Sequence, residues 1–352
     1  MTDQPLVSVV TPCHNAEAFI GETIESVLAQ THRPVEHVIV DDGSSDGSWS
    51  AIERFAKLHP QELRAEREPV SRGASRARNR GAEIARGEFL MFLDADDLLS
   101  PDALGGLVAA LGVHPDAVAY VRWRRLSPGR RGTWRVRPAA VARPGSDPDA
   151  ALRDWLAGRA WVPPCAVLWP RAVFERTGGW SAELTVDDDG ELMMRAFARG
   201  VPLAPATRGM ALYRMPGSAR VSLSRSAMTE ERLRTSRKAV IDRVAVELER
   251  QGRLAEFAPA VGTGYHLVAL AALQEGHPEL AAECQTLGAG LGGEPHVSRT
   301  ASGRALTRVI GYQRKERLVQ WLARRGIASG ERRQSMRRRE LHAGQRSEER
   351  GR

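Results

Sequence analysis

The chain has 352 residues, of which 42% are apolar and 27% charged, so we expect a soluble globular protein of two domains or of one large domain with additions. Its three cysteines, Cys13, Cys165 and Cys284, are odd in number and far apart, which excludes a disulfide framework and a zinc ligand set and fits a reducing cytosol. No segment reaches the roughly 18 uninterrupted apolar residues of a transmembrane helix, and residues 1–5 do not resemble a secretory signal.

The formal net charge of +8 is concentrated in one part of the chain. From Arg299 to Arg352 there are 16 Lys and Arg residues against five Asp and Glu, a net +11, so the remaining chain, with 35 basic and 38 acidic residues, carries −3. The basic character therefore belongs to a tail.

Short apolar runs alternate with helical patterns in the first 70 residues, which predicts a doubly wound parallel sheet. Right-handed crossovers should then place the ends of the first two strands side by side. We expect Pro12 to end the first strand. The expected strands are 6–11, 35–40 and 63–68, and the expected helices are 18–28 and 48–57.

The apolar run Phe89–Leu93 leads directly into Asp94, Asp96 and Asp97, and it predicts a buried strand with carboxylates at its end. Open α/β sheets bind ligands at that edge. Clustered carboxylates repel one another unless something positive compensates, most simply a divalent cation. The alternative interpretation is a solvated acidic loop.

Residues 73–87 predict a loop and a helix rich in arginine, directly before this strand. Guanidinium groups bind phosphate oxygens in pairs, and Arg78 is the best candidate for such a contact. The alternative is that these arginines cover a solvated helix face. The usual glycine-rich phosphate loops are absent from the sequence, so a bound nucleotide would need a metal and side chains for its phosphates.

The sequence contains three motifs in this order: VSVVTPCHNA at 7–16, VDDGSSDGS at 40–48, and ARNRGAEIARGEFLMFLDADD at 77–97. Together they closely resemble family 2 glycosyltransferases, over roughly residues 5 to 220. The resemblance implies the GT-A fold, a Rossmann-like, mostly parallel sheet with helices on both faces. It also implies transfer of a sugar from a nucleotide-diphospho-sugar, with inversion at the anomeric carbon.

The resemblance also assigns residues to the donor. It places Thr11 and Pro12 with the donor-binding residues, and Asp41 and Asp42 as the acidic pair that holds the nucleoside. We group Arg78 with them as the candidate phosphate contact.

Asp94 and Asp96 correspond to the family's D-x-D motif. The resemblance implies that Asp96 ligates Mg²⁺ or Mn²⁺ at the diphosphate, and that Asp94 contacts the ribose and takes part in the metal site. A hard divalent ion with oxygen ligands neutralises the charge of a diphosphate leaving group. Asp97 is expected to support these two residues from behind.

A fourth motif covers residues 173–195 and resembles the family's F-x-x-x-G-G-F-x-E and E-D-x-E-L-x-x-R segments, with Asp188 in place of the usual glutamate. The resemblance implies that Asp189 is the base that takes the acceptor's proton. A shift of one residue would give that role to Asp188; the spacing to Leu192 and Arg195 favours Asp189. A third interpretation is that these acids only cap a helix.

Six of the eight tryptophans, Trp123, Trp134, Trp155, Trp161, Trp169 and Trp180, lie in the acceptor half of the family's fold. Flat aromatic rings can stack on sugars, although most buried tryptophans belong to a core. Trp161 and Trp180 are the best candidates for acceptor contact because they flank the fourth motif. We also expect Asp188 to contact the acceptor.

Beyond the catalytic region, residues 212–218 resemble the family's closing loop without its usual histidine, and we expect a donor-ordered lid at 216–226. Residues 228–291 are helical in pattern, with a hairpin at 264–284 and one apolar face formed by Val240, Ile241, Val244, Val246 and Leu248. The expected units are a catalytic domain at 1–225, a helical appendage at 226–295 and a basic tail at 296–352.

The sequence of residues 304–325 predicts a basic amphipathic helix that could lie on an anionic membrane surface. The chain after Gly326 is expected to be disordered. A solvated tail is the alternative. We predict a cytoplasmic protein that contacts the inner face of the plasma membrane through this helix, with no specific nucleic-acid partner.

The leading hypothesis is an inverting, metal-dependent, non-processive glycosyltransferase of bacterial surface-polysaccharide or glycoconjugate assembly, acting on a carbohydrate or lipid-linked acceptor. The sequence lacks the Q-x-x-R-W motif of polymerising relatives. A haloacid-dehalogenase phosphatase also uses D-x-D, but needs Thr or Val where Asp97 stands. A degenerate binding module, or a protein whose tail binds nucleic acid or membrane, are the remaining alternatives.

Overall fold

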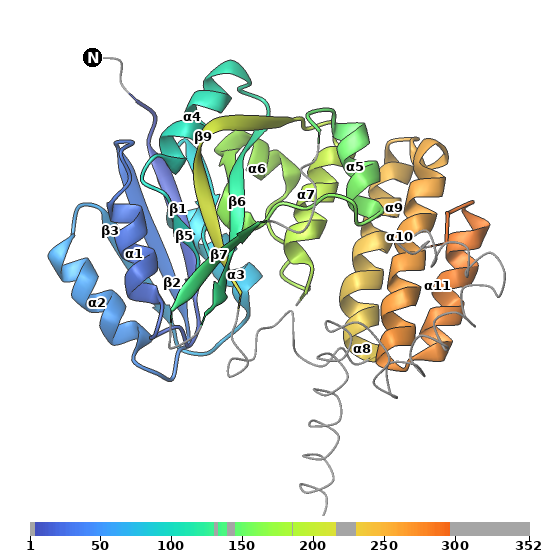
Figure 1. The fold of residues 1–352 in the computed structure, drawn as a ribbon, viewed down its shortest axis with the longest axis horizontal. Helices are drawn as coiled ribbons and strands as arrows, with labels where there is room; N and C mark the ends of the chain where they lie inside the picture. Colours follow the sequence, from blue (N-terminus) through green and yellow to red (C-terminus); the bar gives the residue numbers. More distant parts are fainter. Residues whose placement is uncertain (1–3, 130–132, 139–144, 185, 216–229, 296–352) are drawn as a thin grey trace, which may run out of the picture.

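The computed structural model describes residues 4–129, 133–138, 145–184, 186–215 and 230–295. A curled, mostly parallel sheet with helices on both faces lies beside a block of three long helices (Figure 1). The predicted α/β class is confirmed.

The sheet has the strand order β3-β2-β1-β4-β8-β6-β9-β5, and β7 pairs with β6 outside this path. The first four strands are parallel, β8 is antiparallel to β4 and to β6, and β9 is parallel to β6. The strands are β1 (Val7–Cys13), β2 (Val35–Asp42), β3 (Leu63–Glu68), β4 (Phe89–Phe92), β5 (Leu98–Leu99), β6 (Val118–Pro128), β7 (Trp134–Pro138), β8 (Val167–Pro170) and β9 (Leu203–Arg214).

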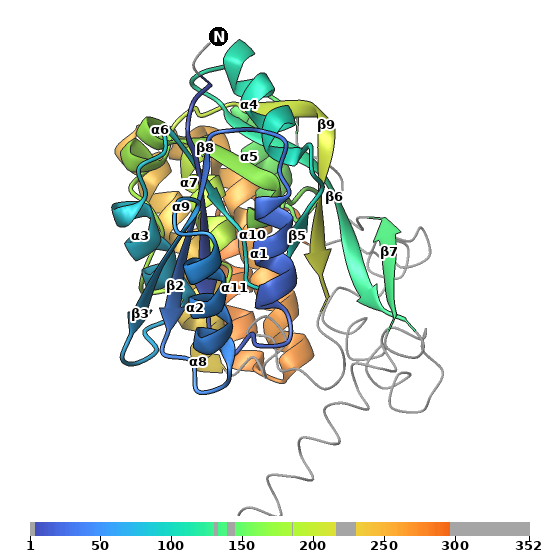
Figure 2. The same ribbon diagram turned by 90° about the vertical axis from the view of Figure 1, so that its left-hand side faces the viewer.

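Helices cover both faces of the parallel part, with α3 on one side and α1 on the other (Figure 2). The helices of this half are α1 (Ile20–Leu28), α2 (Ser48–Leu58), α3 (Ala74–Ile84), α4 (Ala103–Val113), α5 (Pro148–Leu156), a 3₁₀ turn η1 (Pro164–Ala166), α6 (Arg171–Thr177) and α7 (Asp188–Ala198).

Successive side chains of a strand point to opposite faces of the sheet, so each strand contributes residues to the core on both faces. Val38 packs in the cluster that includes α3, and the next residue, Ile39, packs in the cluster under α1 and α2. Helix α3 lies so close to the sheet that a Cβ on Gly81 would meet Val10 Cγ1 at 2.3 Å, so only glycine fits there.

Pro12 does not end the first strand, as the sequence suggested: β1 continues to Cys13. Even-numbered residues of β1 direct their backbone groups toward β4, as the bond from Leu93 N to the Val10 oxygen shows. The ladder with β4 ends at Val10, so the N–H that Pro12 lacks has no ladder partner to lose.

The rest of the described chain is helical, as predicted, with α10 and α11 packed as the expected hairpin. Val246 is 45% exposed and does not share the buried face of Val240, Ile241, Val244 and Leu248. These helices are α8 (Glu230–Arg232), a π-helical turn (Leu233–Lys238), α9 (Ala239–Arg250), α10 (Leu254–Glu275) and α11 (Pro278–Gly290).

The predicted lid at 216–226 and the basic tail at 296–352 lie outside the described residues, so both stay predictions, as do the domain boundaries. In the part of the chain that the structure covers, no helix combines the length and apolarity needed to cross a membrane.

Candidate active site

The acids singled out in the sequence meet at the carboxyl edge of the parallel strands. β1 pairs in parallel with both β2 and β4, so Asp41 and Asp42 at the end of β2 and the acids after β4 lie on the same edge. Cys13 is the register partner of Asp41. The predicted side-by-side strand ends are confirmed.

Asp41 and Asp42 differ in what their carboxylates do. Asp41 is buried, and its Oδ2 lies 3.1 Å from Nε of Arg67. Asp42 accepts hydrogen bonds from Ser71 Oγ (2.7 Å) and from the backbone N–H groups of residues 72 (2.7 Å) and 73 (2.9 Å). The carboxylate of Asp42 therefore holds the loop that leads into α3, and its contact with a nucleoside stays a prediction.

Thr11 and Pro12 are buried within β1. The Thr11 hydroxyl lies 2.8 Å from His37 Nε2 inside the sheet, so its side chain is already engaged. The structure therefore gives no support to their predicted contact with the donor. His14 and Asn15, which follow them, are exposed at the edge.

The loop after β4 is held by contacts from two elements, α1 and β9. The Thr23 hydroxyl donates to the carbonyls of residues 95 and 97, each at 3.0 Å. Asp97 is buried and accepts a bond from Arg214 N at 2.7 Å. Burial, together with the charges of Asp96 and Asp94, raises the pKa of Asp97 well above its usual value. Asp97 thus supports the loop from behind, in line with the sequence prediction.

Arg78 joins the two halves of the site. Its Nη2 lies 2.7 Å from Asp94 Oδ1 and its Nη1 lies 2.8 Å from Asp188 Oδ2, while its guanidinium lies 4.3 Å from the ring centroid of Trp180. The side chain is only 6% exposed. Both terminal nitrogens contact carboxylates, so Arg78 acts as an internal counter-ion, and its contact with a donor phosphate stays a prediction.

The first turn of α7 carries the three acids of the fourth motif. Asp187 is the N-cap residue, in a left-handed backbone conformation (φ 61°) with no capping hydrogen bond from its side chain. Its Oδ2 lies 2.9 Å from Arg237 Nε. Asp188 accepts bonds from Arg78 and from Ser75 Oγ (2.5 Å). The capping interpretation is borne out in position, because Asp187 is the N-cap residue and the next two acids lie in the first turn, where negative charge is favourable, although the Asp187 side chain makes no capping hydrogen bond.

Asp189 has a different environment from its neighbours. Its Oδ2 accepts a bond from Trp161 Nε1 at 3.1 Å, and it borders a cavity whose other lining residues are apolar or aromatic. Burial, with the charges of Asp188 and Asp187, raises the pKa of Asp189 to about 7. Asp188 is committed to Arg78 and Ser75, so the geometry favours Asp189 as the base.

The two tryptophans proposed for acceptor contact differ in accessibility. Trp180 is 4% exposed and packs between Arg78 and Phe92. The ring centroids of Trp180 and Phe92 lie 5.1 Å apart. Its position is that of a core residue, which does not support stacking on a sugar. Trp161 is partly exposed and packs edge-on against Trp123 and Tyr213 while it bonds Asp189.

Arg214 is a site residue that the sequence analysis did not identify. Its Nε donates to the Asp96 carbonyl at 2.6 Å and its backbone N–H to Asp97, and its guanidinium lies 4.6 Å from the Trp134 ring centroid. It also pairs with Glu22 at 2.6 Å. The resemblance at 212–218 covers Arg214 but gives it no role, and its partners Glu22, Asp96 and Asp97 lie more than a hundred residues away in the sequence.

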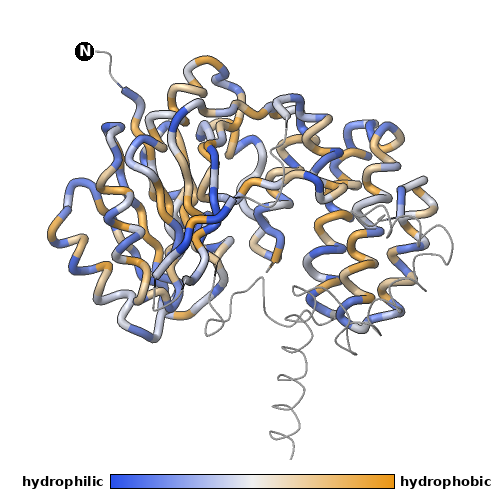
Figure 3. The backbone as a smooth tube through the Cα atoms, in the orientation of Figure 1, coloured by the Kyte–Doolittle hydropathy of each residue, from blue (hydrophilic) through white to orange (hydrophobic). Residues whose placement is uncertain are grey.

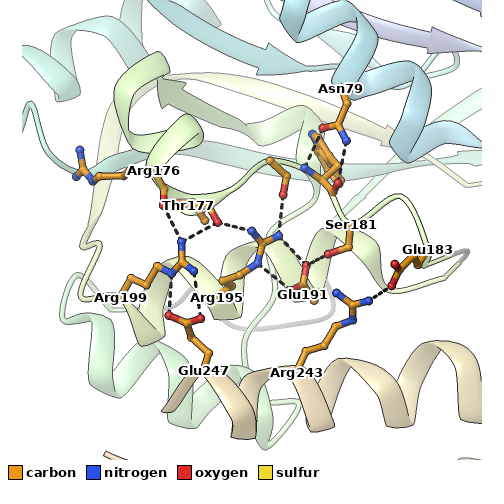
Figure 4. A network of polar contacts seen from close by, with 12 residues as sticks. Asn79, Arg176, Thr177, Ser181, Glu183, Glu191, Arg195, Arg199, Arg243 and Glu247 are labelled. Carbon is orange, nitrogen blue, oxygen red and sulfur yellow. Dashed lines mark hydrogen bonds and ion pairs between the residues drawn. The ribbon is translucent and has the colours of Figure 1, made fainter. Parts of the chain in front are cut away.

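A polar network fixes α7 from behind (Figure 4). Arg195 donates to the carbonyls of Thr177 and Gly179 and pairs with Glu191, which accepts from Ser181 Oγ at 2.7 Å. These bonds tie the turn before Trp180 to the helix that carries Asp189.

Within the described residues, no group of three His, Cys, Asp or Glu side chains is arranged to hold a metal ion. Asp94 and Asp96 fit Mg²⁺ or Mn²⁺ in another way, because these ions accept one or two carboxylates together with phosphate oxygens and water. Arg78 contacts only Oδ1 of Asp94, so that residue keeps its second oxygen. The predicted metal therefore requires the donor as a co-ligand.

Comparison with known proteins agrees with this geometry. Residues 8–167 match the family model described as glycosyl transferase family 2. The chain carries a family 2 glycosyltransferase domain. The matched region contains both acidic loops, and the fourth motif follows it.

One curated relative of this family 2 domain is the putative teichuronic acid biosynthesis glycosyltransferase TuaG of Bacillus subtilis, 40% identical over 101 residues, which are 29% of this chain and 40% of TuaG. The chain thus spans less than half the length of the first curated relatives it matches.

Two solved structures confirm the GT-A fold. Staphylococcus aureus TarS (residues 1–349) in complex with UDP has a TM-score of 0.55 at 18% identity, covering 81% of this chain and 88% of that one. The mannosyltransferase PcManGT of Pyrobaculum calidifontis, in complex with GDP-Man and Mn²⁺, has a TM-score of 0.53 at 22% identity, covering 90% and 84%.

Proposed function

We propose that this glycosyltransferase moves one sugar at a time from a nucleotide-diphospho-sugar to an acceptor hydroxyl, with inversion and with Mg²⁺ or Mn²⁺. The observation that carries the proposal is the bridge from Asp94 through Arg78 to Asp188, with distances of 2.7 and 2.8 Å. This bridge unites the acids after β4 with the helix that carries Asp189.

Asp189 acts as the general base. It takes the proton of the acceptor hydroxyl as that oxygen bonds to the anomeric carbon, and the bond from that carbon to the diphosphate breaks in the same displacement. A single displacement inverts the anomeric centre and needs no second carboxylate as nucleophile. The N–H of Trp161 orients the carboxylate, and a pKa of about 7 suits a base at neutral pH.

The donor occupies the carboxyl edge of the sheet. Asp94 and Asp96 are the residues that would hold the divalent cation, and a bound cation would supply positive charge to the leaving diphosphate. Arg78 holds Asp94 in place, and Arg214 and Thr23 fix the backbone on either side of Asp96.

The comparisons support the donor class and the setting at a coarse level. The names of two structural neighbours give UDP, and GDP-Man with Mn²⁺, as what those proteins hold, and the name of TuaG refers to teichuronic acid biosynthesis. By analogy we infer a role in bacterial surface-polysaccharide or glycoconjugate assembly. A non-processive mode is proposed because the sequence has no Q-x-x-R-W motif.

The first experiment measures binding and metal-dependent hydrolysis of UDP-, GDP-, dTDP- and CMP-sugars with Mg²⁺ or Mn²⁺. The proposal fails if none of them binds. If a nucleotide sugar binds but is neither hydrolysed nor transferred, the degenerate binding module becomes the better hypothesis.

Two substitutions then separate the roles. Asp189→Asn should keep donor binding and lower transfer by about 10²- to 10⁴-fold, the usual contribution of a general base. The primary defect of Asp96→Ala should be the loss of metal-dependent donor binding. Asp188→Asn is the comparison for the base: if it abolishes transfer while Asp189→Asn does not, the base has been assigned to the wrong residue.

A further inference from the structure

The antiparallel ribbon of β6 and β7 carries a concentration of arginine with no internal counter-charge. In the part of the chain that the structure describes, none of these side chains makes a hydrogen bond, an ion pair or a ring contact. Much of the ribbon is hydrophilic (Figure 3), and β7 lies at the outer edge of the sheet (Figure 2). The arginines are Arg122, Arg124, Arg125, Arg135 and Arg137.

Strand register assigns these arginines to two faces. Arg125 is the register partner of both Tyr213 on β9 and Arg137 on β7, so these three side chains lie on one face of the sheet. Arg135 is two residues from Arg137 and shares that face. Arg124 is adjacent to Arg125 in the strand and lies on the opposite face, which Arg122, two residues before Arg124, shares.

The face of Arg125 continues into the proposed active site. Tyr213 packs against Trp161 with ring centroids 5.5 Å apart, and Trp161 donates to Asp189 at 3.1 Å. Burial, and then the charges of Asp97, Asp94 and Asp189, raise the pKa of Tyr213 well above its usual value, in line with a position close to these acids. Trp161 and Tyr213 therefore connect the face of Arg125 to Asp189, the side that we take as the acceptor side.

Two like charges directly opposite each other on a sheet are unfavourable. Arg125 and Arg137 are such a pair, and no acid of the described chain compensates them. A phosphate or carboxylate placed between them would accept charge-assisted hydrogen bonds from both guanidinium groups.

We propose that Arg125, Arg135 and Arg137 form a subsite for a negatively charged group, a phosphate or a carboxylate, on the acceptor. The proposal rests on the proposed function, because it takes the side of Asp189 as the acceptor side. It assigns the acceptor to the class of anionic glycans.

The test uses the full chain and fluorescence anisotropy at low ionic strength, without donor. The probe is fluorescein-labelled tetragalacturonate, with labelled maltotetraose as the neutral comparison and inorganic pyrophosphate as a competing phosphate. The variant Arg125→Gln/Arg137→Gln is compared with Arg122→Gln/Arg124→Gln, which removes equal charge from the other face. Any contribution of the basic tail is then common to both variants.

We expect the Kd for the acidic probe to rise about tenfold in the first variant and less than about twofold in the second, as for the loss of a hydrogen-bonded charged contact. Pyrophosphate should compete with the probe if the subsite accepts phosphate, and should fail to compete if it is specific for carboxylate. The neutral probe should bind alike in all three proteins.

Three outcomes would overturn the proposal. Equal weakening in both variants would indicate nonspecific charge attraction. If the first variant loses only its binding to phosphatidylglycerol vesicles, the ribbon contacts a membrane. If it changes only self-association, the arginines protect an edge strand. Because the assay contains no donor, its result does not depend on whether Asp189→Asn abolishes transfer.

Discussion

Asp189 lies beside two acids of its own helix turn, and each of those acids has an arginine partner. Asp188 pairs with Arg78 at 2.8 Å, and Asp187 pairs with Arg237 of the π-helical turn at 2.9 Å. Asp187 and Asp188 raise the pKa of Asp189, and Arg78 lowers it. Arg237 offsets the charge of Asp187, so the helical region contributes indirectly to the environment of the proposed base.

This arrangement predicts the pH dependence of transfer. The active form of Asp189 is the deprotonated one, so kcat/KM should rise with pH and level off above its pKa of about 7. Asp187→Asn removes a like charge and should move the acid limb to lower pH by about half a unit. Arg237→Gln leaves the charge of Asp187 without its partner, so it should raise the pKa of Asp189 and move the acid limb to higher pH.

The measurement is kcat/KM across about pH 5 to 9, the range in which such a base titrates. Shifts of the two variants in the same direction would contradict the electrostatic account. An unshifted limb with a lowered plateau would indicate that Arg237 only stabilises the fold.

The family motif and its spacing favoured Asp189 over Asp188 as the base, a choice that stays a prediction, but they could not show the contacts of Arg78. Its partner Asp188 is 110 residues away and reaches it only because the fold brings the first turn of α7 beside α3. Arg214 was missed for the same reason, since 118 residues separate it from Asp96. Local patterns carry no information about such contacts.

At the scale of elements, α7 is positioned by a buried arginine and joined to α9 by more exposed ones (Figure 4). Arg195 and Glu191 are 14% and 2% exposed, and Arg199 pairs with Glu247 of α9 at 2.8 Å. Arg243 of α9 reaches Glu183, which is largely exposed.

Arg195→Ala should therefore lower the free energy of unfolding by about 3–5 kcal/mol, because it leaves the Glu191 carboxylate buried without its partner. Arg243→Ala removes an exposed pair and should cost no more than about 1 kcal/mol. Urea denaturation of both variants checks this. Equal losses would mean that burial of the Arg195 pair is not what fixes α7.

Most elements of the parallel half could be predicted because their hydrophobic period and flanking residues agree. The strand at Leu63–Glu68 was expected with these bounds. The errors occur where contacts with neighbouring elements determine the structure. Pro12 is tolerated within β1 because the ladder with β4 ends before it. Val246 lies on the solvent side of α9 despite its apolar side chain.

Considered as a whole, the described chain has a continuous hydrophobic core across the boundary predicted near residue 225. The cluster that contains Val9 of β1 and Leu192 of α7 also contains Val244 of α9 and Phe257 of α10. A helical region that shares its core with the catalytic domain should unfold together with it.

The helix α9 offers a matched pair of substitutions that tests this cooperativity. Val244 is 1% exposed and Val246 is 45% exposed, so Val244→Ala should lower the free energy of unfolding by about 1–3 kcal/mol and Val246→Ala by at most about 0.5 kcal/mol. Two probes follow urea unfolding. Far-UV circular dichroism reports on all helices. Tryptophan fluorescence reports chiefly on residues 123–180, where six of the eight tryptophans lie and which α9, α10 and α11 do not overlap.

If the core is one cooperative unit, Val244→Ala lowers the midpoints of both signals equally, since loss of packing in α9 destabilises the environment of the distant tryptophans. A separate appendage would give the opposite pattern, with a shift in circular dichroism alone and an unchanged fluorescence midpoint. That result would restore the predicted boundary near residue 225. It would also weaken the argument that Arg237 acts on Asp189, because a helical region that opens independently cannot hold a fixed charge beside α7.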